Sequence, residues 1–290
     1  MKRLAVGLSA VFLCGFLFTP AIQMTVPFGA GGPTDIIARH TERAIETNSD
    51  VKTVIINKAG ASGNIGFMSF HKEKSGLLIS TEGIITNKKY LPTNYPESLP
   101  FDITPVYFYG MSPYILFAHI KHLSIEDIID TSKERDILIG SGSPGTGSWI
   151  GMDLLCNKLK ALQKCRSVIY PSASHASADL ITGRIDAYVS FYASYDSFTG
   201  MNSVSALAVM YKNRFELLPH VPTLKEKGID ISNYIWYGLF QKNLDLITVN
   251  KIKASLDNYF TPDRLLKLGF VPIDQSVDEF WKSQLDLLKD

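Results

Sequence analysis

The chain has 290 residues, of which 46% are hydrophobic and 20% are charged, and its formal net charge is +1. This near-neutral balance does not favour a partner that is recognised by bulk charge, so we expect neither nucleic acid nor an anionic membrane surface. The chain is long enough for two lobes of ordinary domain size, each with its own core.

The N-terminal segment has the pattern of a secretory signal. Lys2 and Arg3 precede an apolar run at 4–18, and the residues at 19–21 include small ones at which a signal peptidase can cut. The run is shorter than the roughly 20 residues that cross a bilayer, which makes an uncleaved anchor the weaker alternative. We therefore expect residues 1–21 to be a signal peptide and the mature protein to be exported.

A glycine-rich segment at 27–33, which we call the first loop, follows an expected strand at 24–26 and precedes an expected helix at 34–47. Its three glycines allow unusual backbone angles and close approach of a ligand, and Pro33 suits the first position of a helix. The N–H groups and the positive dipole end of that helix would then face the loop and form an anion site. A tight turn without a ligand is an equally good interpretation of these residues alone.

Apolar β-type runs then alternate with amphipathic stretches, which is typical of α/β order with parallel strands. The expected elements are a strand at 53–56, a helix near 66–74, strands at 77–80 and 107–119, and a helix at 124–132. Ser124 is the expected N-cap of the last helix, with Asp127 at its third position. We expect a lobe boundary near His119.

The same order of elements then starts again. We expect a strand at 136–139, helices at 148–162 and 176–182, and strands at 167–170, 187–190 and 204–210. A loop at 219–223, a short helix at 224–227 that ends at Gly228, a strand at 235–240 and two amphipathic helices complete the chain. Both halves of the chain thus have a strand, a glycine loop and a helix in the same order, which predicts two facing α/β lobes with a cleft between them.

A second glycine-rich segment, at 140–148, also lies between an expected strand and an expected helix. We call it the serine loop, because its glycines expose backbone N–H groups and its hydroxyls can bind an anion; these belong to Ser141, Ser143, Thr146 and Ser148. It also fits the dinucleotide pattern G-x-G-x-x-G. The acidic residue required about 20 positions later is missing, and Tyr170 occupies that region, so a dinucleotide is not favoured.

A third loop, at 57–66, has the same placement between an expected strand and an expected helix. One helix N-terminus stabilises a bound carboxylate by about 0.3 to 2 kcal/mol, whereas micromolar affinity needs about 8 kcal/mol. Several loops must therefore converge on one ligand and exclude water around it.

Catalytic and metal-binding patterns are missing from the sequence, which has no G-x-S-x-G, no H-E-x-x-H and no C-x-x-C. His119 and His122 have the spacing H-x-x-H, but no carboxylate is near them in the sequence. Asp35 is interpreted as a cap for backbone N–H groups, with a general base as the alternative. We therefore expect no catalytic residue, no metal and no cofactor.

Two cysteines, Cys156 and Cys165, remain after removal of the signal peptide. In an oxidising compartment they can form a disulfide if the preceding helix ends between them, near 162. The alternative is two free buried thiols, and the sequence leaves this question open.

Five groups of residues, in this order along the chain, resemble the motifs of a known family. They are Val26-Pro27-Phe28 with Gly31-Gly32 and Asp35; Asn57 with Gly60-Ala61-x-Gly63-x-Ile65-Gly66; Gly140-Ser-x-x-x-Gly145-x-Gly147-Ser148; Asp179-Leu180-x-x-Gly183-x-x-Asp186-Ala187; and Leu218-Pro219-x-Val221-Pro222-Thr223 followed by Trp236-x-Gly238-Leu239-Phe240. Together they resemble the extracytoplasmic solute-binding proteins of tripartite tricarboxylate transporters, often called the Bug family. The resemblance covers nearly the whole mature chain.

The resemblance implies an α/β, two-lobed periplasmic binding protein of the Venus-flytrap, type II-like kind, with a ligand cleft between its lobes and no catalysis. Residues 22–119 and 236–290 are expected to form lobe 1, and residues 120–235 lobe 2. The first loop and the serine loop would hold a carboxylate from opposite sides. By position, the ligand-binding residues are Phe28, Gly29, Ala30, Gly31, Gly32 and Asp35 of lobe 1, and Ser143, Thr146, Gly147, Ser148 and Tyr170 of lobe 2.

Three segments, at 74–78, 168–172 and 241–245, depart from the family's usual motifs. The second of them contains Tyr170, followed by Pro171 and Ser172 where the family usually has lysine and glycine. These departures suggest a divergent member with a ligand of its own.

The sequence therefore predicts a monomer that captures a small organic carboxylate and delivers it to membrane transporter subunits. A di- or tricarboxylate, an acidic amino acid and an aromatic acid are the expected ligand types. One alternative is an exported α/β enzyme that uses Asp35 or a cleft serine on an organic acid. Another is a protein of the same fold that senses its ligand together with a membrane receptor.

Overall fold

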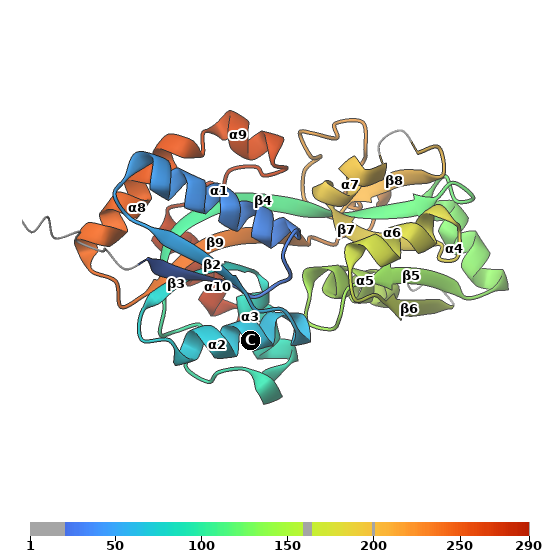
Figure 1. The fold of residues 1–290 in the computed structure, drawn as a ribbon. Helices are drawn as coiled ribbons and strands as arrows, with labels where there is room; N and C mark the ends of the chain where they lie inside the picture. Colours follow the sequence, from blue (N-terminus) through green and yellow to red (C-terminus); the bar gives the residue numbers. More distant parts are fainter. Residues whose placement is uncertain (1–20, 159–163, 199–200, 290) are drawn as a thin grey trace, which may run out of the picture.

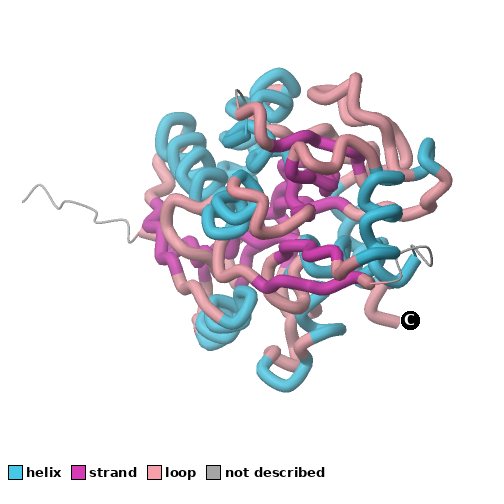
Figure 2. The backbone as a smooth tube through the Cα atoms, turned by 90° about the vertical axis from the view of Figure 1, so that its right-hand side faces the viewer, coloured by secondary structure: helices cyan, strands magenta, loops and turns pink. Residues whose placement is uncertain are grey.

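The computed structural model describes residues 21–158, 164–198 and 201–289 (Figure 1). The predicted signal peptide lies outside these residues except for its last position, so it stays a prediction. Nine strands of the described chain form one sheet in the order β2-β1-β3-β9-β4-β7-β5-β6, with β8 paired to β4. Helices lie on both sides of the sheet (Figure 2). Of the helices in the described ranges, none has the length and apolar character that a membrane crossing requires.

Lobe 1 is built on three parallel strands with an antiparallel neighbour, β9. The strands are β1 (Ile22–Val26), β2 (Thr53–Asn57), β3 (Gly76–Thr81) and β9 (Tyr234–Lys242), and the first three are followed by α1 (Pro33–Asn48), α2 (Asn64–Lys72) and α3 (Gly83–Tyr90). β3 is buried along its whole length, as its apolar sequence requires for a strand covered on both faces. Because β1, β2 and β3 are parallel, the loops after them emerge at one edge of the sheet.

Lobe 2 likewise has parallel strands that are followed by helices. Its strands are β5 (Ile137–Ser141), β6 (Cys165–Ile169), β7 (Ala187–Phe191) and β8 (Val204–Val209), and its helices are α4 (Ile125–Glu134), α5 (Gly147–Lys158), α6 (Ala173–Ile181) and α7 (Tyr192–Phe198). β5 pairs in parallel with β6 and β7, so the serine loop after β5 and Tyr170 after β6 lie at one edge. The predicted cap of α4 is confirmed, because the N–H of Asp127 donates to Ser124 Oγ at 3.1 Å.

The long strand β4 (Thr104–His119) passes through both lobes (Figure 1). Its first part pairs with β9 as far as Pro113, and its second part pairs with β7 from Tyr114 onward, both antiparallel. The strand therefore changes partners between these two residues and is shared by the two lobes. The predicted residue ranges of the lobes, 22–119 with 236–290 and 120–235, stay predictions.

Several elements differ from those predicted. The helices α3 and α7 and the short 3₁₀ helices η1 (Ala61–Gly63) and η2 (Pro92–Asn94) were not expected, whereas η3 (Lys225–Lys227) ends at Gly228 as predicted. The described C-terminal part has three helices, not two: α8 (Leu246–Tyr259), α9 (Pro262–Lys267) and α10 (Val277–Asp286). α9 is separate because Thr261 caps it and Pro262 starts it. The parallel order holds for β1 to β3 and β5 to β7 only, because β4, β8 and β9 pair antiparallel.

Apolar side chains fill both faces of the lobe 1 sheet. One cluster lies under α1 and α8 and includes Ile37, Ile45 and Leu256, all at most 2% exposed. The other lies under α2 and α10 and is aromatic, with Trp236 and Phe240 of β9 at its centre. The indole N–H of Trp236 donates to Oε1 of Gln284 at 2.9 Å, so this buried polar group is satisfied.

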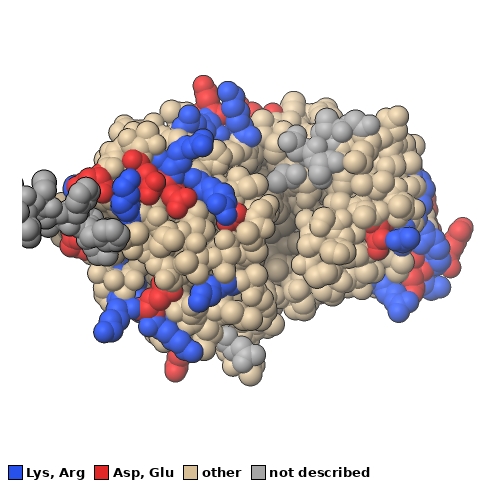
Figure 3. Space-filling view, viewed as in Figure 1, with Lys and Arg blue, Asp and Glu red and all other residues tan. Residues whose placement is uncertain are grey.

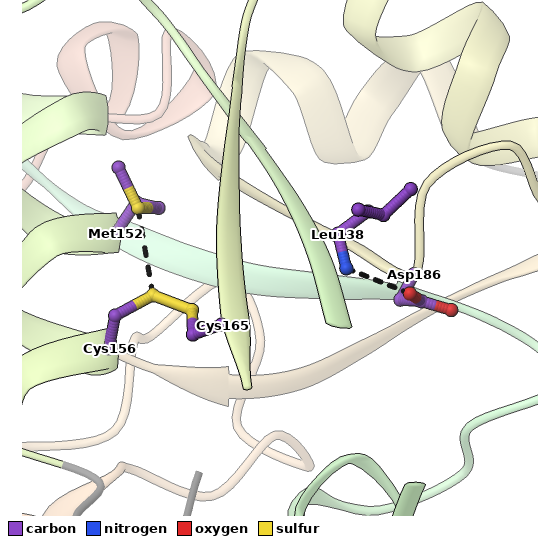
Figure 4. Close-up of a disulfide and its surroundings, with 5 residues drawn as sticks. All are labelled: Leu138, Met152, Cys156, Cys165 and Asp186. Atoms are coloured by element: carbon purple, nitrogen blue, oxygen red, sulfur yellow. Dashed lines mark hydrogen bonds between the residues drawn. A yellow bond between two sulfur atoms is a disulfide. The ribbon is translucent and has the colours of Figure 1, made fainter. Parts of the chain in front are cut away.

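A disulfide joins Cys156 of α5 to Cys165 of β6 (Figure 4), with 5.8 Å between the two Cα atoms. Of the two alternatives that the sequence left open, the structure has the disulfide. The described part of α5 ends at Lys158, and the helix end expected near 162 falls outside the described residues. The disulfide fixes the helix that follows the serine loop to the strand at the edge of the sheet.

A buried carboxylate holds lobe 2 together at the end of the sheet opposite to the serine loop. Asp186, which is 1% exposed, accepts hydrogen bonds from the guanidinium of Arg135 at 2.6 and 2.8 Å. It also accepts a hydrogen bond from the N–H of Leu138 at 2.9 Å (Figure 4). Lys121 and His122 lie at 2.8 and 3.0 Å from the same carboxylate. Burial would raise the pKa of Asp186, but these donors outweigh it and hold the pKa well below its usual range.

We expect Asp186→Asn to lower the free energy of unfolding by about 2 kcal/mol, because it leaves a set of cations facing a neutral amide. The midpoint of denaturation in urea measures this change. Asp130→Asn on α4 is the control, since its carboxylate is exposed and its ion pair with Lys133 is worth at most about 1 kcal/mol. Equal midpoints for the two variants would contradict a stabilising role of Asp186.

Candidate functional site

The three glycine-containing loops lie where the two lobes meet. A Cβ added at Gly63 of the third loop would lie 3.4 Å from the ring of Phe28, so the first and third loops pack together. Ser62 Oγ donates to the carbonyl of Pro144 at 3.1 Å, which joins the third loop to the serine loop. On the face seen in Figure 3 the surface is hollowed between the lobes, and most side chains around the hollow are uncharged.

The first loop is held in place by Asp35, whose side chain is 1% exposed. Its carboxylate accepts hydrogen bonds from the N–H of Gly31 at 2.8 Å, from Arg39 Nε at 2.8 Å and from Asn57 Nδ2 at 3.0 Å. The same Asn57 amide donates to the carbonyl of Phe28 at 3.1 Å. Burial would raise the pKa of Asp35, but these donors outweigh it and hold the pKa below its usual range. Since both carboxylate oxygens are engaged, Asp35 positions the loop.

Helix α1 begins without a side-chain cap. Its N-cap is Gly32 and its first residue is Pro33, as the sequence predicted. Gly29, Ala30 and Gly31 are exposed, and Gly31 has a positive φ of 78°. A Cβ at Gly29 or Gly31 would meet no atom within 4 Å, so the space over the loop is open. The positive end of the α1 dipole therefore adjoins open space that an anion can occupy.

The predicted hydroxyls of the serine loop are used mainly to fix the loop. Thr146 Oγ1 donates to the carbonyl of Ser143 at 2.7 Å. Ser148 Oγ donates to the carbonyl of Val189 on β7 and accepts from the N–H of Gly142 at 3.3 Å. These bonds fix the loop against the sheet and leave its backbone as the main surface available to a ligand.

Gly147, the first residue of α5, lies against a carboxyl group of lobe 1. An added Cβ there would lie 2.6 Å from Oε1 of Glu82 and 2.6 Å from the hydroxyl oxygen of Tyr114. The carbonyl of Gly147 accepts from Asn233 Nδ2 at 2.8 Å. A side chain at this position would require Glu82 or Tyr114 to move, and the N-terminus of α5 faces the carboxyl of Glu82.

Glu82 follows β3 directly and is 9% exposed. Its Oε1 accepts from the hydroxyl of Tyr114 at 3.0 Å, whereas Oε2 has no hydrogen-bond partner among the described residues. None of the ion pairs in the described part of the chain includes Glu82. Burial raises the pKa of Glu82 to about 7, although hydrogen bonds from Tyr114 and the backbone of Gly147 act in the opposite direction.

Helix α3 also contacts the serine loop. Thr86 Oγ1 donates to the carbonyl of Gly145 at 2.7 Å. Asn87 Nδ2 donates to the carbonyl of Ser62 at 2.7 Å and to Asn64 Oδ1 at 2.9 Å. Because both partners are acceptors, the NH₂ group of the Asn87 amide must face them and its oxygen must point away. The oxygen Oδ1 of Asn87 is left without a partner among the described residues.

Tyr170 lies at the same edge of lobe 2 as the serine loop, but its hydroxyl is bound elsewhere. The hydroxyl donates to Asp179 Oδ2 of α6 at 2.9 Å, and burial together with this carboxylate raises the pKa of Tyr170 to about 12. Its ring adjoins Gly140, where an added Cβ would lie 3.2 Å from Cε2. Tyr170 thus borders the serine loop with its ring.

Glu82, Tyr114 and the two polar residues of α3, Thr86 and Asn87, were not among the residues predicted from the sequence. A signal for Glu82 was present, because an acidic residue directly after a buried apolar strand lies at the edge where α/β proteins bind ligands. No such signal marked Tyr114, since periodicity does not reveal where a long strand changes partners.

Other features lie away from these loops. One pocket is lined by residues such as Tyr107, Phe260 and Pro262, and a second by residues such as Met111 and Arg214. Neither contains a predicted ligand-binding residue. In the described ranges, no three His, Cys, Asp or Glu side chains are grouped to hold a metal ion.

Comparison with known proteins places this arrangement in a family. The TctC family, described as the tripartite tricarboxylate transporter family receptor, matches residues 37–261. The protein BugT of Bordetella pertussis is 27% identical over 213 residues, which cover 71% of this chain and 65% of BugT. These matches confirm the resemblance inferred from the motifs.

Solved structures show the same fold. MatC from Rhodopseudomonas palustris with bound malate has a TM-score of 0.78 at 20% identity, covering 93% of this chain and 96% of MatC. A second R. palustris protein, solved with adipate, has a TM-score of 0.80 at 21% identity, covering 94% and 95%. The predicted α/β, two-lobed fold is confirmed, and the chain belongs to the TctC family of periplasmic solute-binding proteins of tripartite tricarboxylate transporters.

Proposed function

We propose that this protein captures a small organic carboxylate between its lobes and presents it to the membrane subunits of a tripartite transporter. The observation that carries the proposal is the uncapped N-terminus of α1, which borders open space beside the serine loop of the other lobe. Backbone N–H groups at such a helix start are suited to an anion. The proteins with malate and adipate support an organic acid as the ligand.

The proposal includes a role for each lobe. The first loop, Phe28 to Gly32, supplies backbone donors that Asp35 holds in place. The backbone of the serine loop, with Ser143, Thr146, Gly147 and Ser148, supplies the opposite wall, and the ring of Tyr170 borders it. Export by the segment 1–21 and action as a monomer without a cofactor are part of the same proposal.

A thermal-shift screen tests this function on the purified mature protein. We expect at least one acid, among di- and tricarboxylates, amino acids and aromatic acids, to stabilise the protein by about 2.7 kcal/mol at 100 times its dissociation constant. A neutral amide of the same acid serves as the control and should give no shift. If no acid shifts the melting temperature, the proposed function is wrong.

Gly32→Val tests the first loop itself. The backbone of Gly32 has φ −77° and ψ 168°, which any residue can adopt, and an added Cβ would lie 3.3 Å from the carbonyl oxygen of Gly29. We therefore expect the variant to fold and to bind the acid found in the screen at least about tenfold more weakly, because its side chain fills the anion's place. Calorimetric titration measures the affinity.

The control for this variant is Ala178→Val, an exposed position on α6, and it should bind as the wild type does. Unchanged affinity in Gly32→Val would contradict the assignment of the first loop.

A further inference from the structure

The N-terminus of α5 faces a carboxyl group of the protein itself. Glu82 of lobe 1 lies against Gly147 of lobe 2, at the place where a second anion would meet the backbone of the serine loop. The two helix N-termini of the site therefore differ. That of α1 adjoins open space, whereas that of α5 already has a carboxyl group beside it.

We propose that Glu82 determines the specificity of the site, selecting small acids that carry one carboxylate and, at the other end, an ammonium group over dicarboxylates. This inference rests on the proposed function and narrows its ligand class. In this arrangement the ligand carboxylate binds the first loop, and its ammonium group lies between the first loop and Glu82.

Two buried acceptors without donors support this assignment. Oε2 of Glu82 and Oδ1 of Asn87, the latter in a side chain that is 0% exposed, have no partner in the described part of the chain. Both side chains face the serine loop, because Cβ atoms added at Gly147 and Gly145 would lie 2.6 Å from Glu82 Oε1 and 2.7 Å from Asn87 Oδ1. Unpartnered buried acceptors cost free energy, and an ammonium group beside Glu82 has N–H donors to offer to the free oxygen of this carboxyl group.

The charge around Glu82 supports the same conclusion. The groups that face it are Tyr114 of β4, Tyr237 of β9, the backbone of Gly147 and the side chain of Thr81, and none of them is a cation. Burial raises the pKa of Tyr114 well above its usual value, so this tyrosine stays neutral. A second ligand carboxylate would meet an ionised Glu82 that none of these groups neutralises, whereas an ammonium group would be attracted.

The raised pKa of Glu82, about 7, gives the selection a pH dependence. Above this pH the carboxylate is ionised, so binding of an ammonium ligand strengthens as the pH rises from 6 to 8. Dicarboxylate binding weakens over the same range because the two carboxylates repel each other.

Calorimetric titration with two matched series of probes tests the proposal at about pH 8. The dicarboxylates are succinate, glutarate and adipate, and the amino acids of equal chain length are 4-aminobutanoate, 5-aminopentanoate and 6-aminohexanoate. We expect the wild type to bind one of the amino acids at least about tenfold more tightly than its matched dicarboxylate. In Glu82→Gln this amino acid loses at least about tenfold in affinity, and the matched dicarboxylate gains.

The control is Glu73→Gln. Glu73 is a partly buried carboxyl of the same lobe, beside Gln23 and Thr25 at the opposite end of the sheet, and this variant should keep the wild-type preference. A wild type that prefers dicarboxylates, with a preference that Glu82→Gln leaves unchanged, overturns the proposal while the proposed function stands. If none of the probes or the acids of the wider screen binds either protein, the proposed function fails and this inference with it.

A measurement without any ligand tests the buried charge directly. A carboxyl whose pKa is raised in the folded state stabilises the fold below its unfolded pKa, near 4.3, and loses this contribution as the pH rises through its folded pKa. The wild type should therefore lose stability relative to Glu82→Gln between about pH 5 and pH 8. Glu126→Gln, at an exposed position of α4, should run parallel to the wild type. A Glu82→Gln curve that is also parallel to the wild type would contradict a buried, unpaired Glu82.

Discussion

The sharing of strand β4 by both lobes is the constraint on which the site depends. The loops that follow a set of parallel strands all emerge at one edge of the sheet. Each lobe has one such edge, so a site between two edges needs both lobes. Because β4 pairs with β9 up to Pro113 and with β7 from Tyr114, it sets the two edges against each other. The first and third loops of lobe 1 thereby meet the serine loop of lobe 2, and Tyr114, which follows the change of partner, contacts Glu82 of lobe 1. The change of partner along β4 therefore brings the loops of the two lobes together.

The side chains that seemed best suited to a ligand are mostly used to hold the loops. Asp35 binds the first loop, Thr146 and Ser148 bind the serine loop, and the hydroxyl of Tyr170 binds α6. The side chains are needed for this purpose because glycine-rich segments lose much conformational entropy on folding. Fixed contacts from side chains hold such segments in one conformation. The backbone then offers donors of fixed direction. Glu82 is different, because one of its two carboxyl oxygens has no hydrogen-bond partner among the described residues.

Much of this structure was predictable from the sequence, and the limits have identifiable causes. The strands, the helices after the glycine loops and the cap at Ser124 follow from local patterns that the fold preserves. The direction of β4 and β9 was not predictable, because alternation of apolar residues is the same in parallel and antiparallel strands. Helix α3 was missed because Gly83 and the short sequence after it give a weak helical signal, and with it the contacts of Thr86 and Asn87 were missed. The roles of the loop hydroxyls depend on partners far away in the chain, such as Val189, that no local pattern contains.

The polar contacts across the cleft have a consequence for the movement of the lobes. Ser62 and Thr86 reach the serine loop through one hydrogen bond each, to the carbonyls of Pro144 and Gly145. When such a bond opens, water replaces the partner, so each bond contributes only about 1 kcal/mol net. A ligand shifts the ratio of closed to open molecules only by the difference between its affinities for the two forms, and a tenfold difference, about 1.4 kcal/mol, is already of the same order as one such bond. A ligand that contacts the loops of both lobes, as the proposed function requires, would therefore favour the closed form, and a membrane subunit that recognises this form would bind the loaded protein in preference to the empty one.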